Sequence, residues 1–293
     1  MGGGSYTAHD WDRLRVSRSI TEDSRENDLF TRRTISEKFN PKYIGMRESR
    51  DNDEHPCSTP IAIGLDVTGS MGYLPEKIIK GGLNELMKKL YASDTIKDPQ
   101  LMFAAVGDVD DDAPLQVTQF ESDIRIAEQL LELWLEKGGG DIPEDYSLFW
   151  YFLAKHTDTD SMKKRNKKGY AFTIGDAPNH PYLDSKDISK IFGDKNTEAP
   201  RYSLQDVVDL CEQSYNLFHI MIDSSTNVIP NRTIHIDKTE LDYLPEIIIT
   251  AICKIEHKNP ADILGEVDTR VQAIIDSSLS NVQFDNIGDV IEV

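Results

Sequence analysis

The sequence predicts an α/β fold, with helices on both faces of a doubly wound, mostly parallel sheet. Apolar runs of strand length alternate along the chain with longer segments whose apolar residues recur at helical spacing. The strand-length runs are continuously apolar, which is typical of parallel strands buried on both faces. A chain of 293 residues, of which 39% are hydrophobic, is long enough to bury such a sheet.

These patterns predict the elements in chain order. Continuous apolar runs predict buried strands, and shorter runs predict edge strands, at 60–66, 101–106, 115–120, 170–174, 217–222 and 234–236. Apolar residues at helical spacing predict helices at 75–91, 124–135, 146–155, 203–214, 240–255 and 264–279.

The chain divides into three parts by composition. Residues 58–258 carry the strand and helix pattern, and residues 259–293 form an acidic extension. Residues 1–57 are polar, with acidic and basic side chains that nearly cancel, and residues 46–56 are expected to join this arm to the main domain. The arm contains more aromatic residues than a disordered tail usually does, so we expect it to pack on the domain through short helices; they are Tyr6, Trp11, Phe30, Phe39 and Tyr43.

Charge and cysteine content narrow the class of partner and the compartment. The net charge of −19 argues against nucleic acid and anionic membranes as partners. The sequence has no apolar run of 18 residues and no apolar stretch of a secretory signal near Met1. Cys57, Cys211 and Cys253 lie far apart, so we expect reduced thiols, buried as small core residues in a cytoplasmic protein.

The most informative cluster follows the first predicted strand. The run ends in Asp66-Val67-Thr68-Gly69-Ser70, and Gly69 indicates a tight turn. The side chains of Asp66, Thr68 and Ser70 are therefore expected to converge at the carboxyl end of a strand, where open α/β sheets bind ligands. One carboxylate and two hydroxyls form an oxygen-only ligand set that suits Mg²⁺ or Mn²⁺. The simplest alternative is that Asp66 or Ser70 only caps the next helix.

Two later clusters have a similar character. Residues 137–144 contain three consecutive glycines and then Asp141, so the backbone there can approach a ligand closely. A glycine-rich turn, with Asp141 capping a helix that begins at Pro143, explains the same residues. In residues 170–180, Asp176 follows a buried strand, as Asp66 does.

The three clusters together resemble the von Willebrand factor A (VWA) family, whose metal-ion-dependent adhesion site begins with a D-x-T-G-S-type motif. The resemblance covers about residues 58–258 and extends to VWA-containing proteins of bacteria and their phages. It implies that Asp66, Thr68 and Ser70 hold Mg²⁺ (or Mn²⁺), with Asp141 and Asp176 acting directly or through water. Gly140 stands where the family often carries a threonine ligand.

The resemblance also implies a function. In the family, an open coordination position accepts a Glu or Asp carboxylate from a protein partner, and in bacteria such domains often partner AAA+ ATPases. The chain is therefore expected to be a metal-dependent binder and not an enzyme. One alternative is a phosphohydrolase of the haloacid-dehalogenase class with Asp66 as nucleophile, although Val67 and Thr68 replace residues that this class needs. Another is a metal-free scaffold.

Three further polar features are expected to face solvent. Residues 108–112 contain four aspartates without EF-hand spacing, and they would border the same pocket if the second strand lies beside the first. The basic run 163–168 leads into a strand and is expected to be a loop on the opposite side from the metal. His180, beside a proline, is expected to be exposed and is not included in the site.

Overall fold

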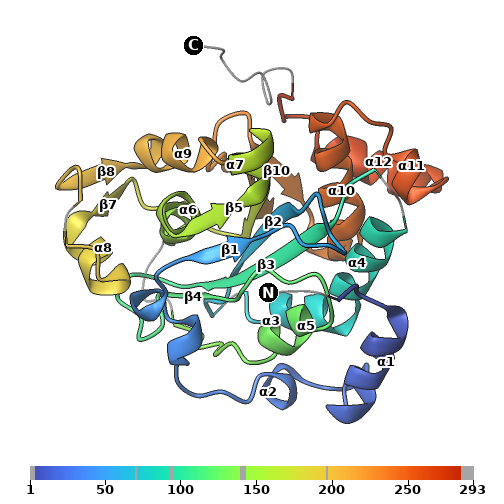
Figure 1. Ribbon diagram of the computed structural model, residues 1–293, viewed down its shortest axis with the longest axis horizontal. Coiled ribbons are helices and arrows are strands. Elements are labelled where there is room, and N and C mark those ends of the chain that lie inside the picture. Colours follow the sequence, from blue (N-terminus) through green and yellow to red (C-terminus); the bar gives the residue numbers. More distant parts are fainter. Residues whose placement is uncertain (1–3, 70, 93–94, 139–142, 196, 285–293) are drawn as a thin grey trace.

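A computed structural model describes the chain except for residues 1–3, 70, 93–94, 139–142, 196 and 285–293. Its centre is a six-stranded sheet with the order β10-β9-β6-β2-β3-β4 (Figure 1). All neighbouring strands are parallel except β4, which runs antiparallel to β3 at one edge. The predicted fold class is confirmed. The strands of this sheet are β2 (Thr59–Asp66), β3 (Pro99–Val106), β4 (Leu115–Val117), β6 (Gly169–Gly175), β9 (Tyr215–Ile222) and β10 (Thr233–Ile236).

Helices cover both faces of the sheet, and alternate side chains of β2 show why. Ile61, Ile63 and Leu65 belong to one core cluster, with α4 and α10, whereas Ala62 belongs to the other, with α6 and α9. Every residue of β2 is buried, as expected for a strand covered on both sides. The helices named here are α4 (Leu83–Tyr91), α6 (Tyr146–Lys155), α9 (Leu204–Glu212) and α10 (Leu244–Ile255).

The remaining helical segments are short. A single helical run reaches from α3 (Tyr73–Lys77) through a π-helical turn, η3 (Ile78–Gly82), into α4. The others lie on both flanks of the sheet and are α5 (Arg125–Leu130), α7 (Asp160–Arg165), α8 (Ser185–Phe192), η4 (Lys238–Tyr243), α11 (Ala261–Leu264) and α12 (Thr269–Ser278). A separate two-stranded antiparallel sheet pairs β7 (Tyr182–Asp184) with β8 (Arg201–Ser203).

The N-terminal arm packs against the domain through its aromatic residues. It contains α1 (Ala8–Ser17), α2 (Glu26–Leu29), η1 (Glu37–Phe39) and η2 (Pro41–Tyr43). Trp11, Phe30 and Phe39 are almost fully buried, and the Tyr6 hydroxyl donates a hydrogen bond to Asn84 of α4. Tyr43 is the exception, because 62% of its surface is exposed.

Two helix predictions are wrong in their extent. The helix expected at 124–135 is α5, which ends at Leu130. The helix expected at 264–279 is instead two helices, α11 and α12. Gly265 between them has a φ of +69°, and Asp268 caps α12 by accepting hydrogen bonds from the N–H groups of Arg270 and Val271.

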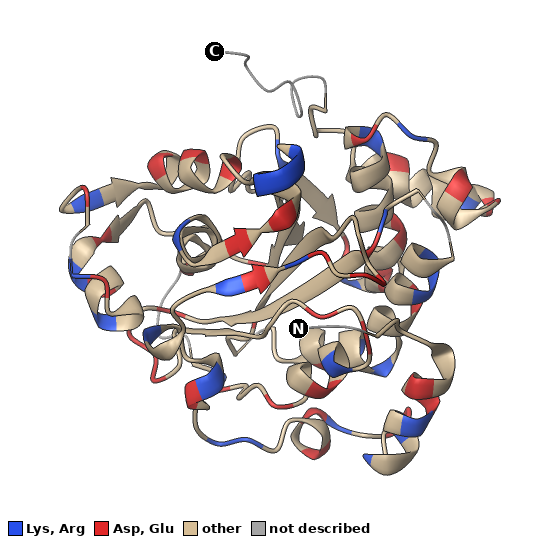
Figure 2. Ribbon diagram, in the orientation of Figure 1, with Lys and Arg blue, Asp and Glu red and all other residues tan. Residues whose placement is uncertain are grey.

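Ordered structure replaces the joint expected at 46–56. β1 (Arg47–Ser49) pairs in parallel with β5 (Thr157–Thr159), and α7 follows β5 directly. α7 contains half of the basic run that was expected to be a loop. Its basic side chains form ion pairs with acidic residues of the joint and of β5–α7, which Figure 2 shows as neighbouring blue and red segments.

We call this group of charges the amino-end network, because it lies where β2 and β6 begin. Arg50 forms ion pairs with Glu48, Asp158 and Asp160. Arg165 donates to both oxygens of Asp51, at 2.7 and 3.1 Å. Burial alone would raise the pKa of Asp51, but hydrogen bonds from Arg165 and Ser58 hold this pKa well below its usual range.

The cysteine prediction holds for two of the three residues. Cys211 and Cys253 are buried, whereas Cys57 is exposed, and all three are free thiols. Within the described ranges, no helix has both the length and the apolar character that crossing a membrane requires.

Candidate functional site

The strand order selects the carboxyl ends of β2 and β6 as the place for a site. The chain leaves β2 toward β3 on one side and leaves β6 toward β9 on the other, although β2 and β6 are neighbours. Crossovers that diverge in this way leave a crevice beyond the two strand ends, and ligands of open α/β sheets bind there. Asp66 ends β2, and Asp176 directly follows β6.

Asp66 and Thr68 lie together at this point, both buried. The Thr68 backbone N–H and hydroxyl both donate to Oδ1 of Asp66, at 2.9 and 2.6 Å. The Tyr146 hydroxyl donates to Oδ2 at 2.9 Å. Gly175 makes room for that tyrosine, because a Cβ at position 175 would lie 2.0 Å from the Tyr146 hydroxyl oxygen.

Asp66 does not serve as a helix cap. The N-terminal cap of α3 is Gly72, without a side-chain hydrogen bond. The pKa of Asp66 is raised to about 6, chiefly by burial and also by the negative charge of Asp176, against hydrogen bonds from Thr68 and Tyr146 that lower it. The carboxylate is therefore held in one orientation but is short of positive charge.

Glu144 adds a second carboxyl group to this site. Glu144 is 6% exposed, and its Oε2 has no hydrogen-bond partner among the described residues. Burial raises the pKa of Glu144 to about 8, and repulsion from Asp66 and Asp108 contributes, against a hydrogen bond with Thr68. A buried carboxyl oxygen without a partner is costly, and a bound cation would remove that cost.

The predicted site residues are distributed as follows. Asp66 and Thr68 are in contact, and Asp176 is close enough for its charge to affect the pKa of Asp66. Ser70 and Asp141 lie outside the described residues. The first and second loops do meet, because the Gly69 N–H donates to the Gly138 carbonyl at 3.1 Å.

Two residues of the site, Glu144 and Tyr146, were not predicted; they stand just after the glycine-rich loop. The helix predicted at 146–155 is confirmed, since α6 begins at Tyr146 with Asp145 as its N-terminal cap. The start at Pro143, expected if Asp141 capped the helix, is wrong. The signal was present in the sequence, since Glu144 and Asp145 are adjacent acids before an apolar helix, where carboxylates often have a structural role.

A second polar cluster lies beside the first. Since β3 neighbours β2, the loop after β3 borders the same end of the sheet, as expected. Asp108 is only 5% exposed, which differs from the solvated loop expected there. Asp108, Asp145 and His180 each offer one ligand atom, and these atoms lie within 4.8 Å of one another. His180 is half-buried, not exposed as predicted, and its Nε2 lies 3.3 Å from Oδ2 of Asp108.

The residues present fit a divalent cation at the Asp66 site. The donor set is two carboxylates and a hydroxyl, the kind that Mg²⁺ and Mn²⁺ prefer. The unpartnered oxygen of Glu144 and the raised pKa values of Asp66 and Glu144 indicate that positive charge is lacking there.

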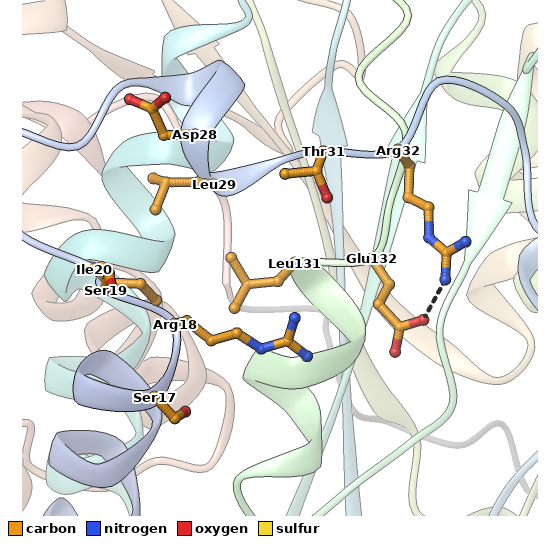
Figure 3. A pocket seen from close by; sticks show the side chains of 10 residues that line it. All are labelled: Ser17, Arg18, Ser19, Ile20, Asp28, Leu29, Thr31, Arg32, Leu131 and Glu132. Atoms are coloured by element: carbon orange, nitrogen blue, oxygen red, sulfur yellow. Dashed lines mark hydrogen bonds and ion pairs between the residues drawn. The ribbon is translucent and has the colours of Figure 1, made fainter.

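A separate pocket lies under the arm. It has a volume of about 730 Å³ and is enclosed by the ends of α1 and α2 and by the residues that follow α5. Figure 3 shows Arg18 extending into it and an ion pair between Arg32 and Glu132 at one side, with a nitrogen–oxygen distance of 3.2 Å. Its lining contains none of the residues around Asp66.

Comparison with known proteins gives structural neighbours only. No protein-family model and no curated protein matches the chain. The pilus adhesin SpaC from Lactobacillus rhamnosus GG is similar with a TM-score of 0.42 and 9% identity, over 79% of this chain and 31% of SpaC. Proximal thread matrix protein 1 from the mussel byssus is similar with a TM-score of 0.44 and 12% identity, over 67% of this chain and 48% of that protein.

The vWF domain of the type V pili tip protein Mfa5 from Porphyromonas gingivalis is also similar. Its TM-score is 0.38 and its identity 10%, over 72% of this chain and 98% of that domain. The chain therefore spans about a third of SpaC and about half of the mussel protein. At these scores and identities the likeness is one of general architecture.

Proposed function

We propose that this protein is a divalent-cation-dependent protein-binding module of the VWA type. The observation that carries the proposal is the convergence of Asp66 and Thr68 at the diverging crossovers, beside the unpartnered buried oxygen of Glu144. The D-x-T-G-S motif supports the same reading. The ligand would be Mg²⁺ or Mn²⁺.

The described residues that would hold the ion are Asp66, Thr68 and Glu144, with Asp176 acting directly or through water. When bound, the ion supplies a concentrated positive charge to which a partner's carboxylate can coordinate. Tyr146 and the Thr68 N–H fix the orientation of the Asp66 carboxylate, so the donor set is arranged before the ion arrives.

The charge around the site favours a particular partner surface. Asp108, Asp176 and the acidic protein as a whole would repel an acidic partner at long range. A partner that offers one Glu or Asp carboxylate within a basic surface complements both the ion and its surroundings. An AAA+ ATPase is a candidate, and the free thiols fit a cytoplasmic setting.

Calorimetric titration with Mg²⁺ and Mn²⁺ tests the metal site. We expect binding to the native protein, at least about tenfold weaker binding to Glu144→Gln, and none to Asp66→Ala. Asp112→Ala, which removes an exposed acid from a nearby loop, should bind as the native protein does. If Asp66→Ala does not fold, Thr68→Val removes the hydroxyl with little change of shape. Equal affinity in all the variants would contradict the proposal.

The rival is a phosphohydrolase with Asp66 as nucleophile. Binding is favoured over this reaction because Asp66 is 1% exposed and both of its oxygens accept hydrogen bonds. Turnover of a generic phosphomonoester with Mg²⁺ is the test, and we expect none. Turnover that disappears in Asp66→Asn would support the rival.

A further inference from the structure

The three residues Asp108, Asp145 and His180 come from separate loops at the carboxyl end of the sheet. Asp108 follows β3, Asp145 precedes α6, and His180 follows β6. Asp108 and Asp145 are 5% and 2% exposed. Among the described ion pairs, the imidazole of His180 is the one that faces Asp108, and Asp145 has no basic partner. The cluster therefore buries more negative than positive charge.

The two carboxylates are held in place by backbone groups. The N–H of Asp110 donates to Oδ1 of Asp108 at 2.9 Å, and the N–H of Val109 donates to Oδ2 of Asp145 at 3.1 Å. Oδ2 of Asp108 is thus directed at His180. Within the described part of the chain, each carboxylate accepts its backbone hydrogen bond through one oxygen and has the other left for a ligand.

Asp145 occupies the N-terminal cap position of α6, but its side chain does not cap the helix. An aspartate at a helix N-terminal cap ordinarily accepts a hydrogen bond from the first turn, but Asp145 makes no such bond to α6. Asn179 replaces it, because its Oδ1 accepts a hydrogen bond from the Ser147 N–H at 2.9 Å. The carboxylate of Asp145 is consequently available to the cluster.

His180 contributes an unsatisfied nitrogen. Its Nε2 is buried and has no hydrogen-bond partner in the ranges that the structure describes, although Oδ2 of Asp108 lies 3.3 Å away. Ligands bound to Zn²⁺ at about 2.0 Å with tetrahedral geometry are separated by about 3.3 Å, so this pair already has the spacing of two zinc ligands. The three ligand atoms lie within 4.8 Å of one another, so binding of Zn²⁺ would bring the two most distant atoms closer together by up to about 1.5 Å.

We propose that Asp108, Asp145 and His180 form a second cation site, selective for a divalent transition-metal ion such as Zn²⁺ over Mg²⁺. An imidazole nitrogen suits Zn²⁺, whereas Mg²⁺ prefers oxygen ligands throughout. Three protein ligands leave a fourth position for water or for a group from a partner. This site is independent of the proposed function, because it shares no ligand with the site at Asp66.

Calorimetry of the full chain with Zn²⁺ tests the proposal. Each protein carries Cys57→Ser, because an exposed thiol binds zinc by itself. We expect one tight Zn²⁺ site, with affinity lowered at least about tenfold in His180→Gln and in Asp145→Asn. His9→Gln removes an exposed histidine from α1 and should leave the affinity unchanged, as should Asp66→Asn, which removes the first site.

The outcomes separate the two sites. Zn²⁺ binding that is lost in His180→Gln but kept in Asp66→Asn supports the second site, whether or not Mg²⁺ binds at the first. Equal affinity in His180→Gln and His9→Gln, or no tight site at all, would overturn the inference. If Asp145→Asn fails to fold, His180→Gln still tests the site, because His180 is partly exposed and its substitution should disturb the fold less.

Discussion

Both ends of the sheet carry many acidic residues, but in the described part of the chain those at the amino end are paired with basic side chains, whereas Asp66 and Glu144 at the carboxyl end are not. At the amino end, Asp51, Asp158 and Asp160 all face arginine or lysine, and their pKa values are lowered. At the carboxyl end, Asp66 and Glu144 are buried with few positive groups, and their pKa values are raised. The paired charges fasten the arm to the domain, whereas the unpaired charges define the candidate site.

Breaking the paired end should have the largest effect. Asp51→Asn removes the charge that Arg165 and Lys164 face, and we expect the free energy of unfolding to fall by about 3 kcal/mol, since it leaves a partly buried arginine uncompensated. Urea denaturation measures the change. Asp53→Asn, a nearby exposed acid, serves as the control, and an equal effect of both variants would show that the network adds no stability.

At the carboxyl end of the sheet, the same kind of substitution should raise the free energy of unfolding instead of lowering it. Glu144→Gln removes a carboxyl group that is repelled by Asp66 and Asp108, and we expect the protein in EDTA at about pH 6 to gain about 2 kcal/mol. In saturating Mg²⁺ the gain should shrink or reverse, because a ligand is lost. A loss of stability in EDTA would contradict the contrast between the two ends.

The pH dependence should also separate native protein from Glu144→Gln. The pKa of Glu144 is about 8 in the folded state against 4.5 in the unfolded state, so the unfolded state releases its proton first as pH rises. The contribution of Glu144 to stability is therefore lost between about pH 4.5 and 8, by up to about 1.4 kcal/mol per pH unit. The difference in unfolding free energy between the two proteins in EDTA should follow that slope, and a flat difference would contradict it.

The smallest effect should come from Tyr146→Phe. It removes one hydrogen bond to Asp66 and leaves the ring in place, so we expect a loss of about 1 kcal/mol in EDTA. Tyr43→Phe, in an exposed residue, is the control. Thermal denaturation measures both variants. If Tyr146→Phe were more stable than the native protein, the Tyr146 hydroxyl would not stabilise the fold.

The fold was largely predictable because its signals are local. β2 and β6 are continuous apolar runs of strand length, and α6 is an apolar segment of helix length. β1 and β5 were not predictable, because each has three mostly polar residues and exists only through pairing with a partner 110 positions away. α11 and α12 were merged because the helical pattern continues past Gly265, where the backbone turns.

The candidate site was predictable only where it follows a strand. Asp66 and Asp176 end buried strands, and the strand order brings those ends together. Glu144 reaches the site from a loop whose path no periodicity describes. Its burial, like that of Asp145, depends on the contact of its segment with the loop after β6, where the Glu144 N–H bonds the Pro178 carbonyl.

The pairing of β1 with β5 constrains the order in which the molecule can fold. Arg47 leaves the ribosome long before Thr157, its partner in the ladder. β2 likewise waits for β6, which begins at Gly169. In the meantime β3 can cover only the other edge of β2. Such long-range pairing is slow to form, so one edge of the apolar strand at the heart of the sheet stays unpaired until β6 has been made.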